Sequence, residues 1–533
     1  EDWPEDPERP NEGVQFDAVV MNPPYSAKNW NRAGLKVSDP RFEMAGVLPP
    51  DSKGDYAFLL HGLYHLGQHG TMAIVLPHGV LFRGGTEGEI RKRLIEKNYI
   101  DTIIGLPDKL FTNTGIPVIV MVLKKDRKLN DPVLFIDASK NFIKVGKQNV
   151  LQEKDIAKIV DTYTERREEK GYSHLATREE IIENEYNLNI PRHVESIEEE
   201  IPHDVDAHLY GGIPRENIED LNVLQSTVPH VLERSLEEIR PGYVTLAKSM
   251  EEITKDVLND PVVIEKSKEM ETMVTTYIDK YFQALKTVED VNQIPELRHD
   301  MLEEIKGMLL QFNHIDVYDG YQIIAEIWEN TLTEDTEIIA GSDFYTAGRS
   351  RVPNMVTKGS GRNKRMEQDG WMGSIVPNDL IIEHLYSEEL ATIEAKQTEL
   401  QDVDTELNDL VEAAKVEDSE EEAALSEALN DREDAFLIGS VRAELKETKE
   451  DSNEYSLLKR VESLLTDKTK LNREVRTLQK ELKEAAQERI EMLTDEEIDQ
   501  LMYEKWFGHV VEEMVRLIEK PLRAELNTLE ELQ

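Results

Sequence analysis

The residues with the clearest chemical potential are the tetrapeptide Asn22-Pro23-Pro24-Tyr25, which directly follows the apolar run Phe16–Met21. Two consecutive prolines fix two φ angles and remove two N–H donors, so the turn is stiff and displays carbonyl oxygens. The amide oxygen of Asn22 and the carbonyl oxygen of Pro23 can both accept from one exocyclic NH2 group. Tyr25 adds an aromatic face on which a planar substrate can stack, a contact worth about 1–3 kcal/mol per base.

These groups suit the transfer of a methyl group to a planar amine such as N6 of adenine. The lone pair of that amine is delocalised into the ring, which makes it a poor nucleophile. Two acceptors directed at its hydrogens favour the pyramidal geometry that develops in the transition state. Inside duplex DNA the base must first be flipped out, at a cost of roughly a few kcal/mol. The alternative interpretation is that the tetrapeptide is only a rigid turn after a strand.

Short apolar runs and amphipathic segments alternate around the tetrapeptide. The runs are continuous, as in strands that are covered on both faces. The segments Asp55–Gln68 and Thr86–Asn98 place apolar residues at helical spacing, and Gly70 marks a helix end. This alternation predicts an α/β layer with a largely parallel sheet, in which the tetrapeptide lies outside the carboxyl end of a strand, where such folds bind ligands. The predicted strands are Phe16–Met21, Thr71–Leu76, Ile100–Leu106, Val118–Leu123 and Val133–Ile136.

The rest of the chain is predicted to be helical. Two heptad registers, from Ile393 to Ala414 and from Leu457 to Ala485, indicate a coiled coil. Gly439 and Ser440 offer a reversal point between them, so we expect a long antiparallel coiled-coil hairpin. A Gly- and Ser-containing stretch, Gly341–Gly361, separates this tail from earlier helical segments, which are Asp155–Lys170, Ile305–Phe312 and Tyr321–Leu332.

A chain of 533 residues is too long for one core. We expect four regions: a partial catalytic domain over 1–140, a helical completion of it over 141–200, a helical domain over 201–375, and a coiled-coil or helical assembly region over 376–533. The first residues, Glu1–Glu12, are rich in proline and acid and are expected to form a loop.

The composition narrows the function classes. Lys plus Arg number 62 against 108 for Asp plus Glu, a net charge of −46, so the surface should repel phosphates unless a basic partner helps to hold DNA. The absence of cysteine excludes disulfides, iron–sulfur clusters and thiolate zinc sites. Without an apolar run of about 20 residues, a membrane span is not expected. We therefore expect a cytoplasmic protein with no membrane partner.

The motifs from Phe16 onward closely resemble those of the modification (M) subunit of type I restriction–modification systems, an N6-adenine DNA methyltransferase. The resemblance is dense from about residue 16 to 195, looser around Tyr321–Trp328, and rests on helical character alone in the tail. Besides the tetrapeptide, the motifs that carry it are Asp55-Tyr56-Ala57-Phe58, Gly70–Gly85, Ile104-Gly105-Leu106-Pro107, Leu110–Pro117, Val133–Ser139 and Asn187–Arg192.

The resemblance implies a fold and a site. The fold would be the C-terminal part of a Rossmann-like methyltransferase sheet, followed by the all-α region. The catalytic residues would be Asn22, Pro23, Pro24 and Tyr25: Asn22 and Pro23 hold the target amino group, and Tyr25 stacks on the flipped adenine. Phe111 matches a position that borders the base from its other face, although it could equally be a core aromatic at a strand–loop junction.

The same resemblance implies partners and a cofactor. The partners would be DNA, a specificity (S) subunit, a second M subunit and an optional restriction (R) subunit. The methyl donor would be S-adenosyl-L-methionine. The family carries a Gly-rich strand–loop–helix for this cofactor before the tetrapeptide, and nothing like it stands between Glu1 and Asp17.

Two downstream glycine pairs, in Lys358–Gly361 and Tyr210–Gly212, lack the flanking strand or helix of a cofactor loop. Since Glu1 is not a methionine either, we expect the remainder of a longer protein, or a second chain that supplies the cofactor half. The chain alone is then expected to be inactive.

Two other functions stay open. One is methylation of a protein glutamine by the same amine-holding turn, which the long helical tail and the segment Leu110–Pro117 do not favour. The other is a catalytically dead assembly subunit that has lost its cofactor half.

Two weaker signals complete the survey. His61, His65 and His69 recur every four residues and would line one helix face, but no carboxylate or thiolate completes a metal site. We therefore expect no metal. The stretch from Arg349 to Arg365 contains six basic side chains and no acid, which suits phosphate or an acidic partner, or else a solvated loop. Its cations are Arg349, Arg351, Lys358, Arg362, Lys364 and Arg365.

Overall fold

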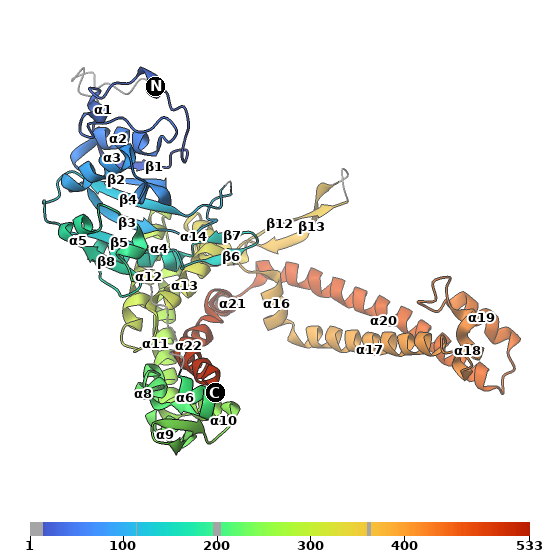
Figure 1. The fold of residues 1–533 in the computed structure, drawn as a ribbon. Helices are drawn as coiled ribbons and strands as arrows, with labels where there is room; N and C mark the ends of the chain where they lie inside the picture. The colour runs from blue at the N-terminus through green and yellow to red at the C-terminus, as the bar shows by residue number, and fades with distance from the viewer. Residues whose placement is uncertain (1–13, 113, 196–203, 360–363, 533) are drawn as a thin grey trace. The chain divides into compact units, whose positions relative to one another are not determined.

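The computed structural model describes residues 14–112, 114–195, 204–359 and 364–532, except the side chains of Val205 and His208. The chain forms two compact units (Figure 1). The first comprises residues up to 267, then 302–326 and 516 onward, and the second comprises 268–301 and 327–515. The predicted loop Glu1–Glu12 lies outside the described residues, and the four-region division stays a prediction. Among the described residues, no helix combines the length and the apolar character that crossing a membrane would require.

A six-stranded sheet forms the core of the first unit, in the order β1-β2-β4-β3-β5-β8. All five predicted strands are present, but β2 begins where the end of a helix was predicted, so Gly70 lies inside a strand. The sixth strand, β8, was not predicted. The strands are β1 (Phe16–Met21), β2 (Leu66–Pro77), β3 (Ile100–Gly105), β4 (Val118–Lys124), β5 (Val133–Asp137) and β8 (Ser173–Ala176).

The prediction of a largely parallel sheet is wrong, because the sheet is mixed. β1 pairs with β2 and β3 with β5 in parallel, whereas β4 is antiparallel to both of its neighbours and β8 is antiparallel to β5. The segment 106–117 joins β3 to β4 without the crossover helix that usually connects parallel neighbours, and the two strands pair antiparallel. β1, β2, β3 and β5 still point the same way. Their carboxyl ends therefore share one edge of the sheet, which we call the carboxyl edge.

The two faces of the sheet are covered differently. On one face Met72, Ile74 and Phe135 pack with the helices α2 (Asp55–His65) and α3 (Thr86–Glu96). On the other face Ile104 and Leu134 belong to a second cluster, to which α4 (Glu153–Glu165) contributes.

The expectation that β1 is covered on both faces is wrong. β1 is an edge strand, and the side chain of Val20 is 86% exposed. Met21, which points to the other face, packs against the α2–α3 side.

The helices of the first unit continue after β8. They surround a small three-stranded sheet in the order β10-β11-β9. The region 201–375, predicted to be a helical domain, thus also contains this small sheet, which was not predicted. The remaining elements of this part are α1 (Pro40–Glu43), β6 (Ile143–Val145), β7 (Gln148–Val150), α5 (Arg178–Glu183), α6 (Val205–Tyr210), β9 (Ile213–Pro214), α7 (Arg215–Glu219), α8 (Asn222–Thr227), α9 (Pro229–Ser235), β10 (Leu236–Arg240), β11 (Tyr243–Leu246), α10 (Met250–Leu258) and α12 (Ile294–Leu309).

The second unit is mostly helical and includes one two-stranded ribbon. The stretch expected to separate the tail from earlier helical segments contains a helix and the first ribbon strand within its described residues, 341–359. Four helices, α11, α12, α13 and α22, contain residues of both units. The elements are α11 (Pro261–Lys286), α13 (Val317–Ile327), α14 (Thr333–Ala340), α15 (Phe344–Arg349), β12 (Arg351–Lys358), β13 (Arg365–Gly373), α16 (Asn378–Leu385), α17 (Ser387–Ala413), α18 (Glu420–Leu425), α19 (Ile438–Glu447), α20 (Asn453–Arg489), α21 (Asp495–Phe507) and α22 (Val510–Glu531).

The predicted helical hairpin corresponds to α17 and α20, which run side by side (Figure 1). Their antiparallel register is fixed by ion pairs from Lys396 to Glu474 and from Lys468 to Asp404, both 2.6 Å long. The predicted reversal at Gly439 is wrong, because that residue lies inside α19. The chain reverses instead through a small helical cluster that buries Leu425 and Val441 against α20. Coiled-coil packing of the pair stays a prediction.

Candidate active site

The tetrapeptide Asn22–Tyr25 lies at the carboxyl edge, immediately after β1. The parallel register pairs Met21 with Ile74 of β2, so the turn begins level with the last residues of that strand. Pro23 is buried and Asn22 is exposed. The amide of Asn22 is therefore accessible to a substrate, as a role in holding an amino group requires.

Tyr25 and Asn22 are joined within this turn. The phenol of Tyr25 donates a hydrogen bond of 2.9 Å to Oδ1 of Asn22. Because a carbonyl oxygen has two lone pairs, Oδ1 keeps one free for a second donor. Partial burial raises the pKa of the Tyr25 hydroxyl, so the group stays protonated and can donate at neutral pH. The hydrogen bond thus orients the amide and leaves an acceptor position on it.

Phe111 lies against Tyr25, although 85 residues separate the two in the chain. The ring centroids are 6.0 Å apart and the planes meet at 69°, an edge-to-face contact. Both rings are partly buried against the cluster around Ile104 and Leu106. The structure therefore brings the two predicted base-contacting residues together, and it equally gives Phe111 the core packing of the alternative interpretation.

Asp55 fixes the backbone next to Tyr25, a role that sequence reasoning missed. Its carboxylate is 1% exposed and accepts from the backbone N–H of Ser26 at 2.6 Å. Ser26 has a φ of +50°, in the left-handed region that side chains rarely adopt, so the turn needs such a tether. Asp55 also accepts from Arg83 at 3.0 Å. The signal in the sequence was the motif that opens α2, which marked a helix start and contributed to the family resemblance but gave Asp55 no role of its own.

A second layer of polar contacts holds these helices. The guanidinium of Arg91 donates to the backbone oxygens of Val80, Arg83 and Tyr186 at 2.8–3.1 Å. Tyr56 donates to Val80 as well, at 2.8 Å, and burial raises its pKa to about 12. Donors from α2 and α3 thus converge on the loop that carries Arg83. Through Arg83 and Asp55 they support the turn at Ser26.

His78 is a further titratable group at the carboxyl edge, directly after β2. Burial lowers its pKa, against the opposing effect of the Asp137 carboxylate at the end of β5. The ring contacts Phe82 with centroids 5.6 Å apart. His78 is therefore a neutral donor or acceptor near pH 7, and no sequence motif singled it out.

The described residues do not form a complete cofactor site. Among them, no glycine-rich turn joins a strand of the six-stranded sheet directly to a helix. The free edge of β1 and the exposed side chain of Val20 leave that side of the sheet uncovered. Within the described part of residues 14–195, Asn22, Tyr25 and Phe111 lie together, and no glycine-rich turn of the expected kind joins a strand to a helix.

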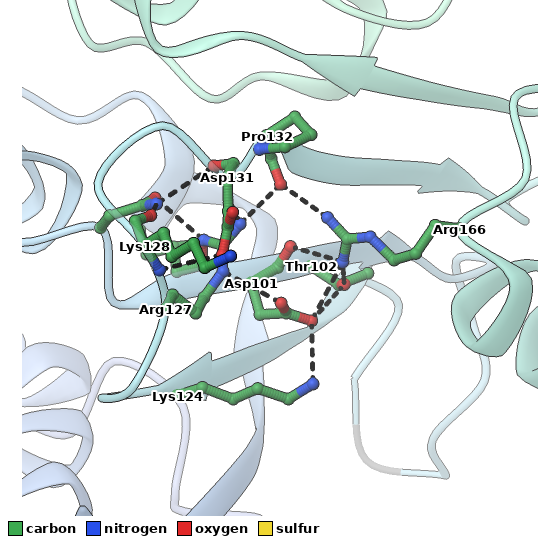
Figure 2. A network of polar contacts seen from close by, with 10 residues as sticks. Asp101, Thr102, Lys124, Arg127, Lys128, Asp131, Pro132 and Arg166 are labelled. Atoms are coloured by element: carbon green, nitrogen blue, oxygen red, sulfur yellow. Dashed lines mark hydrogen bonds and ion pairs between the residues drawn. The ribbon is translucent and has the colours of Figure 1, made fainter. Parts of the chain in front are cut away.

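A polar network lies at the opposite edge of the sheet from the carboxyl edge, where β3 and β5 begin and β4 ends, and it stabilises the fold (Figure 2). Asp101 is 5% exposed and faces three cations: Arg127 at 3.1 Å, Arg166 at 3.2 Å and Lys124 at 3.7 Å. The guanidinium of Arg127 also donates to Asn98, Ile100, Asp131 and Pro132. A cavity of about 710 Å³ opens here, but its most buried cation has its donors occupied within the protein. These contacts tie together the ends of β3, β4 and β5.

The two weaker sequence signals have different outcomes. α2 ends at His65, so His61, His65 and His69 do not share one helix face, and His69 instead contacts Asp126 at 3.1 Å. In the described part of the basic stretch, Arg349 ends α15, and the strands β12 and β13 contain most of the other residues. Arg349 and Arg351 bind Asp495 and Glu491, while Lys358 and Arg365 share Glu367. Arg362 lies outside the described residues, and Lys364 is exposed.

Comparison with known proteins identifies relatives of the first part of the chain. A family model described as N-6 DNA Methylase matches residues 4–201. The type I restriction enzyme MpnII methylase subunit of Mycoplasma pneumoniae is 45% identical over 183 residues, which cover 34% of this chain and 34% of that protein. The MjaIX methylase subunit of Methanocaldococcus jannaschii is 32% identical over 236 residues, which cover 41% and 42%.

Solved structures include a similar protein. The type I restriction–modification methyltransferase subunit from Streptococcus thermophilus is 54% identical over 37% of this chain and 40% of that one, with a TM-score of 0.35. The chain spans about a third to two fifths of the length of the two curated relatives above. Within that span, which contains Asn22–Tyr25 and Phe111, the predicted resemblance to type I methylation subunits is confirmed.

Proposed function

We propose that this chain acts as the amino-group-binding part of a type I methylation subunit that methylates N6 of adenine in DNA. The observation that carries the proposal is the convergence of Asn22, Tyr25 and Phe111 at the carboxyl edge, in the region that matches N-6 DNA methylases. The two alternatives, glutamine methylation and a dead assembly subunit, gain no support from these relatives.

Asn22 and Pro23 would hold the target amino group. One lone pair of Asn22 Oδ1 is occupied by the Tyr25 hydroxyl, and the other accepts a hydrogen from N6. The backbone oxygen of Pro23, in a turn that two prolines stiffen, accepts the second hydrogen. Acceptors fixed in advance favour the tetrahedral nitrogen of the transition state over the planar amine of the ground state.

Tyr25 and Phe111 would receive the flipped base. Their present edge-to-face contact is worth about 0.5–1.5 kcal/mol, and an incoming adenine must displace it. Stacking of a base on an aromatic side chain contributes about 1–3 kcal/mol. Exchange of one contact for the other therefore ranges from a loss of about 0.5 kcal/mol to a gain of about 2.5 kcal/mol, and a gain offsets part of the cost of flipping.

The methyl donor, S-adenosyl-L-methionine, would supply an electrophilic methyl group. Since the described residues lack the expected glycine-rich turn, we infer that most of its site comes from a further segment or a second chain. The isolated 533-residue chain is then inactive. A partner of the chain, or a further segment, must therefore supply most of the cofactor site.

The proposed partners are DNA, an S subunit, a second M subunit and an optional R subunit. The net charge of −46 requires that much of the DNA be held by a less acidic subunit. The paired helices α17 and α20 would dock against helices of the S subunit, as the family resemblance implies.

The test compares the isolated chain with a reconstituted enzyme. That enzyme contains this chain, a segment or chain with the Gly-rich cofactor half, and an S subunit. With labelled cofactor and duplex DNA, we expect N6-methyladenine from the reconstituted enzyme and none from the isolated chain. Turnover by the isolated chain would refute its inactivity, and methylation of protein glutamine instead of adenine would refute the function.

A further inference from the structure

A short basic hairpin lies beside the candidate site. Its strands β6 and β7 are joined by a two-residue turn, Gly146-Lys147, in which Gly146 has a φ of +62°. From Ala138 to Gln152 the sequence contains three lysines, Lys140, Lys144 and Lys147, and no acid. All three are exposed. In a chain with a net charge of −46, such a segment is unusual.

One face of this hairpin is apolar and exposed. Ile143 and Val145 of β6 and Val150 of β7 share that face, because Ile143 pairs with Val150 and side chains alternate along a strand. Their side chains are 42%, 56% and 39% exposed. A hairpin that only covered the domain would turn these residues inward, so its apolar face is available to a partner.

Asn149 ties the hairpin to the loop that carries Phe111. This side chain is 5% exposed, and its amide donates to both the backbone oxygen and the carboxylate of Asp108, at 2.9 and 2.8 Å. Its backbone N–H donates to the oxygen of Lys109 at 3.2 Å. The acid in these contacts is Asp108, and the Asn149 amide occupies its backbone oxygen and one of its carboxylate oxygens. The hairpin is thus connected to the carboxyl edge within two residues of Phe111.

We propose that the β6–β7 hairpin is a DNA-binding element that contacts the duplex next to the flipped adenine. Lys140, Lys144 and Lys147 bind backbone phosphates. The Ile143–Val145–Val150 face lies against the groove and the bases that become unstacked when the adenine leaves. This inference rests on the proposed function, since it takes DNA as the substrate of the neighbouring site.

Charge and side-chain type favour DNA over a protein partner. Lysines bind phosphates as point charges, and three of them without a neighbouring acid inside the segment match a polyanion. Two-stranded ribbons fit the major groove of DNA, and apolar side chains are used by proteins that open a base step. A protein partner that covered the apolar face would not require the three surrounding lysines.

Site-directed cross-linking tests the proposal. The chain contains no cysteine, so a single introduced cysteine carries a photoreactive maleimide at one known position. In the full chain, V145C reports on the hairpin, I116C on the Phe111 loop, and L310C on an exposed position elsewhere; the three side chains are 56%, 44% and 73% exposed. Each labelled chain is assembled into the reconstituted enzyme described above and irradiated with a duplex that contains adenine.

We expect covalent DNA adducts from V145C and I116C and none from L310C. Adducts from I116C but not V145C would overturn the hairpin's role and leave the proposed function intact. Absence of adducts from both would count against both proposals. Equal adducts from all three positions would mean non-specific contact and would also overturn the inference.

Lysine substitution separates phosphate binding from apolar contact. K140Q, K144Q and K147Q combined in the V145C chain should lower the slope of log affinity against log salt by about 0.9 per phosphate contact, about 2.7 in total. The matched control is K255Q, K446Q and K449Q, three exposed lysines outside the hairpin, which changes the net charge equally. Equal slopes for the two triple variants would refute phosphate binding by the hairpin.

Discussion

The hydroxyl of Tyr25 lies 2.9 Å from Oδ1 of Asn22 and donates a hydrogen bond to it. The ring proposed to stack on the base therefore also orients the amide proposed to hold its amino group. These two roles can be separated by substitution.

Tyr25→Phe removes the hydroxyl and keeps the ring. We expect kcat of the reconstituted enzyme to fall about fivefold, equivalent to one hydrogen bond of about 1 kcal/mol, with unchanged DNA affinity. Tyr25→Ala removes the ring as well and should weaken binding of a flipped base by about 1–3 kcal/mol. Steady-state methylation measures the first effect, and the fluorescence of 2-aminopurine at the target position measures the second. Equal losses in both variants would show that the ring does not stack on the base.

Asp55 should hold the turn in place without touching the substrate. In Asp55→Ala, the Ser26 N–H and the Arg83 guanidinium lose a buried acceptor, which we expect to destabilise the turn by about 3 kcal/mol. Hydrogen exchange at the Ser26 amide should then become fast. Asp55→Asn retains an oxygen acceptor and should preserve much of the protection, and Asp51→Asn, at an exposed position, should preserve all of it. Full protection in Asp55→Ala would contradict this role.

At the edge of the sheet opposite the carboxyl edge, we expect Arg127 to contribute more to stability than the other cations around Asp101. Its side chain is only 4% exposed. Arg127→Met leaves Asp101 and the backbone oxygens of Ile100 and Pro132 without this donor, and we expect a loss of about 3 kcal/mol. Arg166→Met should cost less, because that side chain is 31% exposed and solvated. Thermal unfolding of the two variants compares them. A larger loss of thermal stability in Arg166→Met than in Arg127→Met would contradict this prediction.

His174 should titrate above the ordinary histidine range. Despite desolvation, which lowers its pKa, hydrogen bonds to Glu180 and Glu168 raise it overall. The protonated ring therefore stabilises the fold below the unfolded pKa of about 6.5, and this contribution is lost as pH rises through the folded pKa. NMR titration of labelled histidines should show a pKa above 6.5 that falls in Glu168→Gln. An unchanged pKa in that variant would exclude the Glu168 contact at 2.8 Å as a cause.

Local pattern predicted the strands better than their pairing. Continuous apolar runs located β1, β3, β4 and β5 to within a residue or so; for β3, β4 and β5 the reason is burial in the sheet, whereas β1 has an apolar run although it is largely exposed. The same runs cannot show direction, so the antiparallel insertion of β4 was missed. β8 was missed because Ser173–Ala176 is short and only half apolar.

The candidate site was predicted to a similar extent. The tetrapeptide indicated Asn22 and Tyr25 because its residue types have few structural uses in that order. The contact with Phe111 followed only from family resemblance, since pairing across 85 residues leaves no local signal. Asp55 was missed because an acid at a helix start has an ordinary explanation as a capping residue. Only the fold shows that its carboxylate binds Ser26 instead.

The central claim is that Asn22 holds the amino group of adenine. The direct measurement is N6-methyladenine formed by the reconstituted enzyme with Asn22 or with Asn22→Ala, quantified by mass spectrometry of the digested duplex. Loss of a preorganised acceptor should lower kcat by about 10²–10³, with cofactor binding unchanged. Methylation by Asn22→Ala at the rate of the unsubstituted enzyme would contradict the account.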